Sequence, residues 1–489
     1  MKTEVNSKQK LQIALLTVVT YIVMLVFLLF TVLKNAYKNG QWIPITAYCA
    51  LIAVFFVFFV IFFFKAEGKK KNCVRKVGAI YTVFVISYVV MHFTIKINYC
   101  FAPLAMCILI LTQLVGIKIA AYVNISQLLI FFISHYVFET AITQLEALVC
   151  LFLGLATITV VMFSEKSHKD RLSYLVTALK IAVTSILVVT LFYFIFDGIT
   201  SEFSWLTYTR DACMSCLGGI FDIMAMFLLV PLLERIFNIT TNFRLAELAN
   251  TNHPLLVRLL KEAPGTFSHS LTVANYAEAC AMAIGENTYL ARAAGCYHDI
   301  GKLQNPAYFS ENQADGYNPH NEIAPEISVS FLKNHVSYGV SLAKAYRLPP
   351  EIESAIVEHH GTFVMKFFYL KAKKYTEGEL SVANYCYDGP APVSKINSIL
   401  MIADSCEATL RALSVSDKNT AEKVVDGIVS ERMSFGQFDN SELSMKEIDI
   451  IKQTIISTYL GTKHERVKYP ELKISADNGG TGGDKNNAN

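Results

Sequence analysis

This sequence carries little net charge for its length. Its 489 residues include 43 Lys and Arg and 40 Asp and Glu, which leaves a formal charge of +3. It has no basic stripe with aromatics between the charges, so nothing favours binding of a nucleic-acid polymer. The eleven cysteines are scattered and form no disulfide framework. The one Cys-x-x-Cys, Cys213 to Cys216, lacks a second pair or a nearby His, and we interpret it as incidental.

Hydrophobic residues, by contrast, are in excess. They make up 53% of the chain, and the mean hydropathy of +0.39 is too high for a soluble protein. The excess lies in residues 11 to about 237, whereas residues 238–489 have charges throughout. A membrane-spanning helix needs about 20 mostly apolar residues. Eight segments meet this requirement: about 11–33, 45–64, 77–95, 99–116, 119–138, 144–163, 173–196 and 213–234.

Loop charges predict how these segments cross the membrane. Lys65–Lys76 holds six basic residues, Ser164–Arg171 holds three, and the amino terminus has three lysines. Such segments face the cytoplasm. The two loops are consistent with each other, because the four spans between them, an even number, put both on the same side of the membrane. Eight spans therefore place both termini in the cytoplasm. Only Ile117-Lys118 separates the fourth span from the fifth, and fusing these spans would move the C-terminal half to the other side.

Some ionisable residues lie inside the predicted spans: Lys180, Asp222, Glu146, His92 and His135. Such groups are costly in lipid and often mark a pathway or a sensing cavity. The structural alternative is that Lys180 reaches the inner interface, Glu146 lies near an outer end and Asp222 pairs with a neighbour. Because no proton-relay spacing or inverted repeat is visible, a transporter is disfavoured.

The C-terminal half is typical of helices joined by short loops. Apolar residues recur at helical spacing in Leu245–Leu260 and Leu271–Ile284, and Glu351–Glu358 opens after two prolines. No alternating run predicts strands, so we expect an all-α fold with a polytopic helical membrane domain followed by an all-helical domain. The expected parts are a cytoplasmic amino terminus (1–10), a membrane domain of about eight helices (11–234), a cytoplasmic domain (235–475) and a disordered tail (476–489).

Histidines are concentrated in this half, where eight of the eleven lie between residues 253 and 464. The pair His298-Asp299 is central, because adjacent imidazole and carboxylate groups, with imidazoles from other segments, can hold divalent metals and activate water. Gly301 permits close approach of the chain, and Lys302 is placed either to meet a phosphate or to lie in solvent. The further candidate ligands are His269, His335, His359, His360 and Asp404, whereas His253, His320 and His464 stay outside the set.

These residues carry a resemblance to a known family. His269, His298-Asp299 and Asp404 form the H…HD…D pattern of HD-domain phosphohydrolases, and the other candidate histidines are similar to members that bind two metals. Over roughly residues 70–470 the chain resembles the seven-transmembrane HD family, the PgpH-like cyclic-di-AMP phosphodiesterases of bacteria. The segments that carry this closer resemblance are Leu232-Leu-Glu-Arg-Ile-Phe-Asn-Ile-Thr-Thr-Asn, Asn252-His-Pro-Leu-Leu, Glu262-Ala-Pro-Gly-Thr-Phe-Ser-His-Ser, Glu311-Asn-Gln, Asn318-Pro-His and His359-His-Gly-Thr.

The resemblance implies a cytoplasmic HD-superfamily domain held at the lipid bilayer, with two iron or manganese ions. A hydroxide activated by these metals would open cyclic-di-AMP to linear pApA, with His298, Asp299 and Lys302 as the catalytic residues. Metal identity, base preference and a homodimer stay open. The seven ligands would divide between the metals, with Asp299 as the bridge: His269, His298 and Asp404 on one metal, and His335, His359 and His360 on the other.

One departure and three alternatives stay open. Family members carry a large extracytoplasmic domain after the first span, but here only Lys34–Pro44 separates the first two spans, which leaves the regulatory input undecided. A cyclic-di-GMP phosphodiesterase of the HD-GYP type would need Gly-Tyr-Pro after the second His pair, where this chain has Gly361-Thr-Phe. A nucleotide triphosphohydrolase would not account for the eight predicted spans. A receptor or transporter with a non-catalytic HD module would not account for the presence of all seven candidate ligands.

Overall fold

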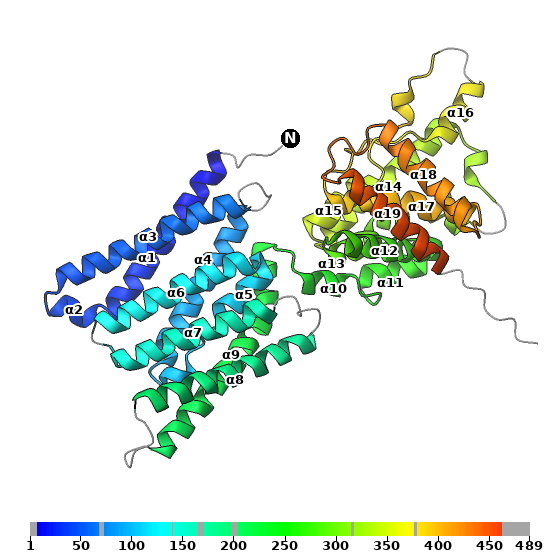
Figure 1. Ribbon diagram of the computed structural model, residues 1–489. Helices are drawn as coiled ribbons and strands as arrows, with labels where there is room; N and C mark the ends of the chain where they lie inside the picture. Colours follow the sequence, from blue (N-terminus) through cyan, green and yellow to red (C-terminus); the bar gives the residue numbers. More distant parts are fainter. Residues whose placement is uncertain are drawn as a thin grey trace, which may run out of the picture. The chain divides into compact units, whose positions relative to one another are not determined.

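The computed structural model is built of helices. It describes residues 7–67, 73–138, 140–164, 171–196, 204–313, 317–375 and 379–461. Within these residues the one β pairing is an isolated antiparallel bridge between Val364 and Cys386. The predicted all-α fold is thereby confirmed (Figure 1). The expected tail and His464 lie outside the described residues.

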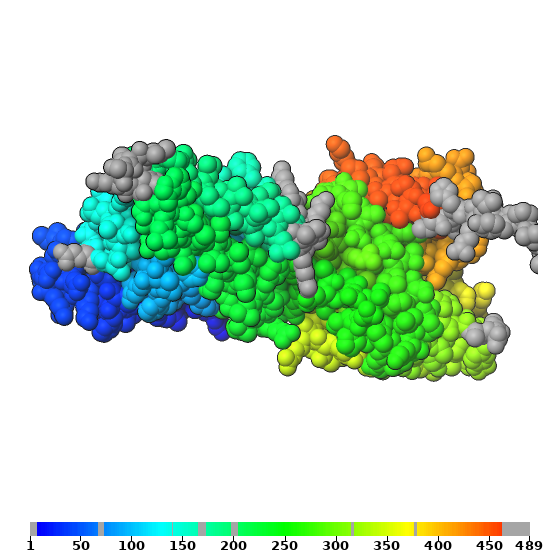
Figure 2. All heavy atoms as spheres, turned by 90° about the horizontal axis from the view of Figure 1, so that it is seen from below, coloured from blue at the N-terminus to red at the C-terminus, as the bar shows by residue number. Residues whose placement is uncertain are grey.

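The N-terminal part is a bundle of apolar helices. Within the described residues, seven helices are long and apolar enough to span a membrane: α1 (Ser7–Thr31), α3 (Trp42–Glu67), α4 (Cys73–Thr94), α6 (Ile117–Val137), α7 (Gln144–Ser164), α8 (Arg171–Phe196) and α9 (Trp205–Phe237). The short helix α2 (Lys34–Lys38) joins α1 to α3. Figure 2 shows the side chains of this part, coloured blue to green, packed into one continuous body. The chain is a multi-pass membrane protein.

The fourth predicted span differs from the other seven. Instead of one membrane-length helix, the chain forms a 3₁₀ turn, η1 (Tyr99–Phe101), and the ten-residue helix α5 (Met106–Val115), which packs against α4, α6 and α9. Gly116, with φ of 93°, separates α5 from α6, so the two are not fused. The stretch is apolar enough for a span, and hydropathy alone does not reveal the break.

Two buried polar side chains satisfy the backbone at this break. The Ala105 N–H donates to Asp222 Oδ2 of α9 at 3.1 Å, and the Ile108 N–H donates to Asn124 Oδ1 of α6 at 3.1 Å. The Asn124 amide donates in turn to the Leu104 carbonyl at 3.1 Å. Such partners are required because lipid offers none to an interrupted helix. Asp222 thus pairs with the backbone at the start of α5, and its role is structural.

The other intramembrane ionisable residues also have local partners. Lys180 donates to Ser164 Oγ at 3.4 Å. His135 is buried, and its Nδ1 lies 2.8 Å from Ser134 Oγ. Its ring centroid lies 6.0 Å from that of His92. Glu146 Oε2 accepts from the Thr143 N–H at 2.7 Å, which caps α7.

The C-terminal part is a set of shorter helices, several of which begin at proline. The predicted helix Leu245–Leu260 is in fact two helices, because the chain breaks before Pro254, which starts the second of them. The helices are α10 (Asn242–Leu248), α11 (Pro254–Glu262), α12 (Pro264–Ile284), α13 (Thr288–Tyr297), α14 (Pro325–Ala345), α15 (Pro350–Glu358), α16 (Lys366–Tyr375), α17 (Lys395–Ala412), α18 (Lys418–Ser434) and α19 (Met445–Gly461). Between them lie the 3₁₀ turns η3 (Ile300–Gln304), η4 (Pro306–Tyr308), η5 (Ser310–Asn312), η6 (Pro319–Asn321) and η7 (Val382–Tyr385).

Candidate metal centre

The pair His298-Asp299 lies in the sharp passage from α13 into η3. Both side chains are buried, with 0% and 1% of their surface exposed, and His298 Nε2 lies 3.2 Å from Asp299 Oδ2. Gly301 makes this passage possible, because a Cβ there would lie 1.7 Å from the His335 carbonyl oxygen. The backbone of η3 therefore runs directly against α14, the helix that carries His335.

Asp299 has two further charged or ionisable neighbours. Lys302 Nζ lies 2.7 Å from Asp299 Oδ2, and His335 Nε2 lies 3.5 Å from Oδ1. Lys302 is only 9% exposed, so it is not the solvated helix charge that the sequence left open. Its ammonium group instead compensates the charge of a buried carboxylate.

His269 and Asp404 form a second polar group. His269, on α12, points Nε2 at Asp404 Oδ1 of α17, 3.0 Å away. Its Nδ1 contacts the Glu407 carboxylate, one turn further along α17. A carboxylate on the far nitrogen fixes the ring orientation and the tautomer of a metal-binding imidazole. The sequence search missed Glu407, although its position three residues after Asp404 places both on one helix face.

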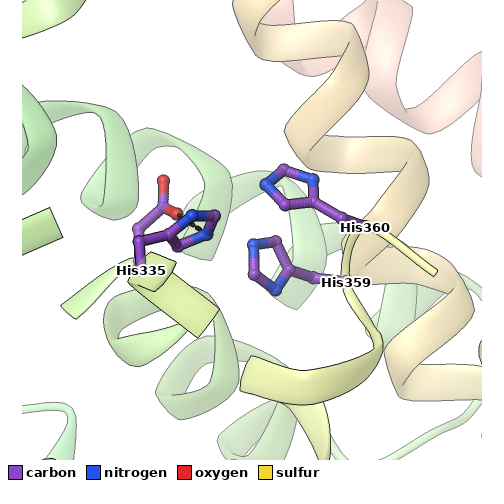
Figure 3. Close-up of side chains that lie close together, drawn as sticks. His335, His359 and His360 are labelled. Carbon is purple, nitrogen blue, oxygen red and sulfur yellow. Dashed lines mark ion pairs between the residues drawn. The ribbon is translucent and has the colours of Figure 1, made fainter. Parts of the chain in front are cut away.

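His359 and His360 follow the end of α15. Their rings lie 3.9 Å apart, and His360 Nδ1 is 3.7 Å from Asp404 Oδ2. The His360 ring also stacks on Tyr387, with centroids 4.2 Å apart. In Figure 3 the rings of His335, His359 and His360 point toward one another.

The turn after this His pair is held by one glutamine. Gly361 has φ of 55°, which favours glycine. The Thr362 N–H donates to Gln437 Oε1 at 3.1 Å, and Gln437 Nε2 donates to Thr362 Oγ1 at 3.0 Å. Gln437 is 2% exposed, so this reciprocal pair fixes the direction in which both imidazoles leave the backbone.

The seven predicted ligands therefore meet in two groups that share one residue. Within each group, one nitrogen or oxygen atom per residue lies within 4.8 Å of the others, and Asp299 belongs to both groups. Imidazole nitrogens and carboxylate oxygens in this proportion suit a divalent transition metal, and a shared carboxylate suits a pair of such ions. The donor set thus fits two metals. The groups are His269, His298, Asp299 and Asp404, and Asp299, His335, His359 and His360.

Two other histidines lie apart from these groups and have structural contacts. His320 Nε2 lies 2.8 Å from the Tyr308 carbonyl oxygen, and its ring packs on Phe368. The His253 ring meets the Tyr297 ring edge-on, 5.6 Å away, and burial lowers the pKa of His253. Among the residues that the structure describes, neither one belongs to a group of potential metal ligands.

Comparison with known proteins matches both parts of the chain. The model of the family "7TM receptor with intracellular HD hydrolase" matches residues 42–241, and the HD domain model matches residues 266–409. The chain is similar to cyclic-di-AMP phosphodiesterase PgpH of Listeria monocytogenes serotype 1/2a (strain 10403S), with 43% identity over 244 residues, and to PgpH of Bacillus subtilis (strain 168), with 37% identity over 311 residues. The chain belongs to the PgpH-like family. The 7TM match begins at α3, so α1 precedes it.

The alignments cover only part of each PgpH relative, which limits the conclusions that can be carried over to this chain. The alignments cover 50% and 64% of this chain but only 34% and 43% of the two PgpH relatives. The chain thus spans less than half the length of these PgpH proteins. A crystal structure of the L. monocytogenes PgpH HD domain in complex with cyclic-di-AMP is 41% identical, covers 44% of this chain and all of its own, and has a TM-score of 0.42.

Proposed function

We propose that this PgpH-like protein is a membrane-anchored, metal-dependent phosphodiesterase that hydrolyses cyclic-di-AMP to linear pApA. The observation that carries the proposal is the membership of Asp299 in both ligand groups. A bridging carboxylate is what a two-metal phosphodiester site needs to hold its ions close together. The names of the two PgpH relatives support the choice of substrate.

Two ions, which we propose to be iron or manganese, would supply an activated water and neutralise charge on the phosphoryl oxygens. The chain's own residues do the positioning. His269, His298 and Asp404 would hold one ion, with Glu407 keeping His269 in orientation. His335, His359 and His360 would hold the other, on the turn fixed by Gln437.

Lys302 has a separate place in this proposal. Its ammonium group is buried and lies 2.7 Å from the Asp299 carboxylate, so a positive charge is held beside the two ligand groups. A point charge in a water-poor site favours an anionic phosphodiester and the further charge that develops on it during the reaction. Lys302 thus both balances Asp299 and attracts substrate.

We also propose that the HD domain faces the cytoplasm. The basic loops Lys65–Lys76 and Ser164–Arg171 support this orientation, because loops rich in Lys and Arg favour the cytoplasmic side of a membrane. The membrane anchor would then hold a cytoplasmic site beneath a lipid bilayer. Whether two copies associate stays open.

The test uses the full chain, purified in detergent and loaded with Mn²⁺ or Fe²⁺. Cyclic-di-AMP and cyclic-di-GMP are supplied separately, and the products are resolved by chromatography. We expect pApA from cyclic-di-AMP, with turnover lost in Asp299→Ala and retained in Asp426→Ala. The control is matched because Asp426 is an exposed aspartate of α18, paired with Lys452 at 3.0 Å.

The other results separate the alternatives. Preferential turnover of cyclic-di-GMP would keep the reaction class and replace the substrate. Turnover of nucleoside triphosphates alone would indicate the nucleotide phosphohydrolase. No turnover of any of these by a metal-loaded sample would contradict the proposal and favour a receptor with a non-catalytic HD module.

A further inference from the structure

The membrane part contains a cavity of about 250 Å³, far along the chain from the candidate metal ligands. It lies where α7 begins, α8 ends and α9 begins, beside η1. These three helices lie side by side in the bundle (Figure 1). The cavity is therefore at the opposite end of α9 from Phe237, where that helix leads to the C-terminal part.

A buried carboxylate organises one wall of this cavity. The Asp211 side chain is 1% exposed and accepts four hydrogen bonds. Asn98 and Tyr193 donate at 2.8 Å, Arg210 Nε at 3.0 Å and the Tyr99 hydroxyl at 3.1 Å. So many donors are needed because an ionised carboxylate in a membrane helix is costly.

The charges that line the cavity do not cancel. Arg210 is paired with Asp211, which accounts for one positive and one negative charge. Glu146 also lines the cavity, and its carboxylate accepts a hydrogen bond from the Thr143 N–H at 2.7 Å. No ion pair is formed by Glu146 within the described part of the chain. One carboxylate is therefore left without a compensating cation.

Aromatic rings supply much of the remaining lining. Tyr99, Phe192, Tyr193 and Phe196 all line the cavity, and the rings of Phe192 and Phe196 stack with their centroids 5.7 Å apart. Aromatic faces attract ammonium groups, and a carboxylate beside them selects a cation over a neutral apolar molecule.

We propose that this cavity binds a small organic ammonium ion, with Glu146 as the counter-charge and the four rings as the cage. The proposal stands apart from the phosphodiesterase proposal, because neither its residues nor its test involves the metal centre. The resemblance to the HD family implies no ligand site in this cavity. A ligand of a few heavy atoms makes few contacts and loses its translational freedom on binding, so a Kd in the millimolar range is expected.

The chain offers a fluorescent reporter beside the cavity. It has only two tryptophans, and the ring of Trp205 lies 6.1 Å from Tyr208, which in turn lies 5.5 Å from Tyr193. In the full-length protein with Trp42→Phe, Trp205 is the single indole. Its emission is recorded in detergent during titration with n-butylammonium, and with butyrate as the anion of matched size.

We expect a saturable change with n-butylammonium, and binding of butyrate at least about tenfold weaker, since the uncompensated charge is negative. Glu146→Gln should weaken n-butylammonium binding by a similar factor. This variant keeps the fold, because glutamine also serves in a helix capping box. Glu262→Gln, an exposed residue of α11, is the matched control and should bind as the parent does.

Three results would overturn the proposal. They are the absence of any saturable change at millimolar n-butylammonium, equal or tighter binding of butyrate, and unchanged affinity in Glu146→Gln. None of them depends on phosphodiesterase activity, so failure here is distinct from failure of the proposed reaction.

Discussion

At the scale of single residues, Glu407 shows how a candidate metal ligand, His269, is held in orientation by a neighbouring carboxylate. It is 5% exposed and contacts His269 Nδ1, which leaves Nε2 directed at Asp404. Removing such a supporting carboxylate typically costs about 10- to 100-fold in metal affinity. We expect a loss of this size in Glu407→Gln, measured by titration of the apo protein with Mn²⁺. Glu422→Gln, on α18, is the control, and equal affinity in both variants would contradict this role.

Lys302 leads to a kinetic prediction. Its ion pair with Asp299 is nearly buried, so Lys302→Met removes a charge from the site with little change in side-chain volume. Loss of one such electrostatic group lowers the rate by about 100-fold or more. We expect that drop in kcat/KM for cyclic-di-AMP at full metal occupancy. Activity near that of the parent would show that Lys302 only balances charge.

Gly301 and Gly427 form a matched pair for stability. A methyl group at Gly301 would meet the His335 carbonyl oxygen, whereas one at Gly427, within α18, would meet nothing within 4 Å. Overpacking costs about 1–3 kcal/mol or more, but alanine in a helix interior gains about 0.5–1 kcal/mol over glycine. Thermal unfolding should therefore show Gly301→Ala less stable, and Gly427→Ala more stable, than the parent. The reverse order would refute the close approach at Gly301.

At the scale of elements, the broken fourth span makes its own prediction. Asp222 accepts the Ala105 N–H at the start of α5. Because asparagine keeps an acceptor oxygen there, Asp222→Asn should leave the membrane part folded. Asp222→Leu leaves a backbone donor without a partner, at a cost of about 1–3 kcal/mol. Detergent-dependent unfolding of the two variants tests this, and equal stability would speak against the cap.

The elements also show what sequence can and cannot predict. Length and hydropathy located the seven long spans, because each is apolar along its whole length. They could not reveal the break before α5, since it depends on Asp222 and Asn124, which come from distant helices. Likewise the histidines and aspartates singled out in the sequence as candidate ligands are brought together in the structure, but Glu407 was missed because a supporting carboxylate has no spacing pattern of its own.

At the scale of the whole molecule, the membrane part and the HD domain are joined by one chain segment. α9 carries Arg210 and Asp211 near its start and ends at Phe237, and α10 begins at Asn242. In the sequence, the residues that line the cavity thus come before or at the start of α9, and the candidate metal ligands come after its end. Each site has its own test, so either can stand if the other fails.

The central claim is that two metals bridged by Asp299 act together on one phosphodiester. The most direct test is cyclic-di-AMP turnover by the full chain as Mn²⁺ is added stepwise to the apo protein, with bound metal measured in each sample. The account predicts little turnover at one ion per chain, a steep rise as the second binds, and loss of both binding and turnover in Asp299→Ala. Full turnover at one ion per chain, or without metal, would contradict it.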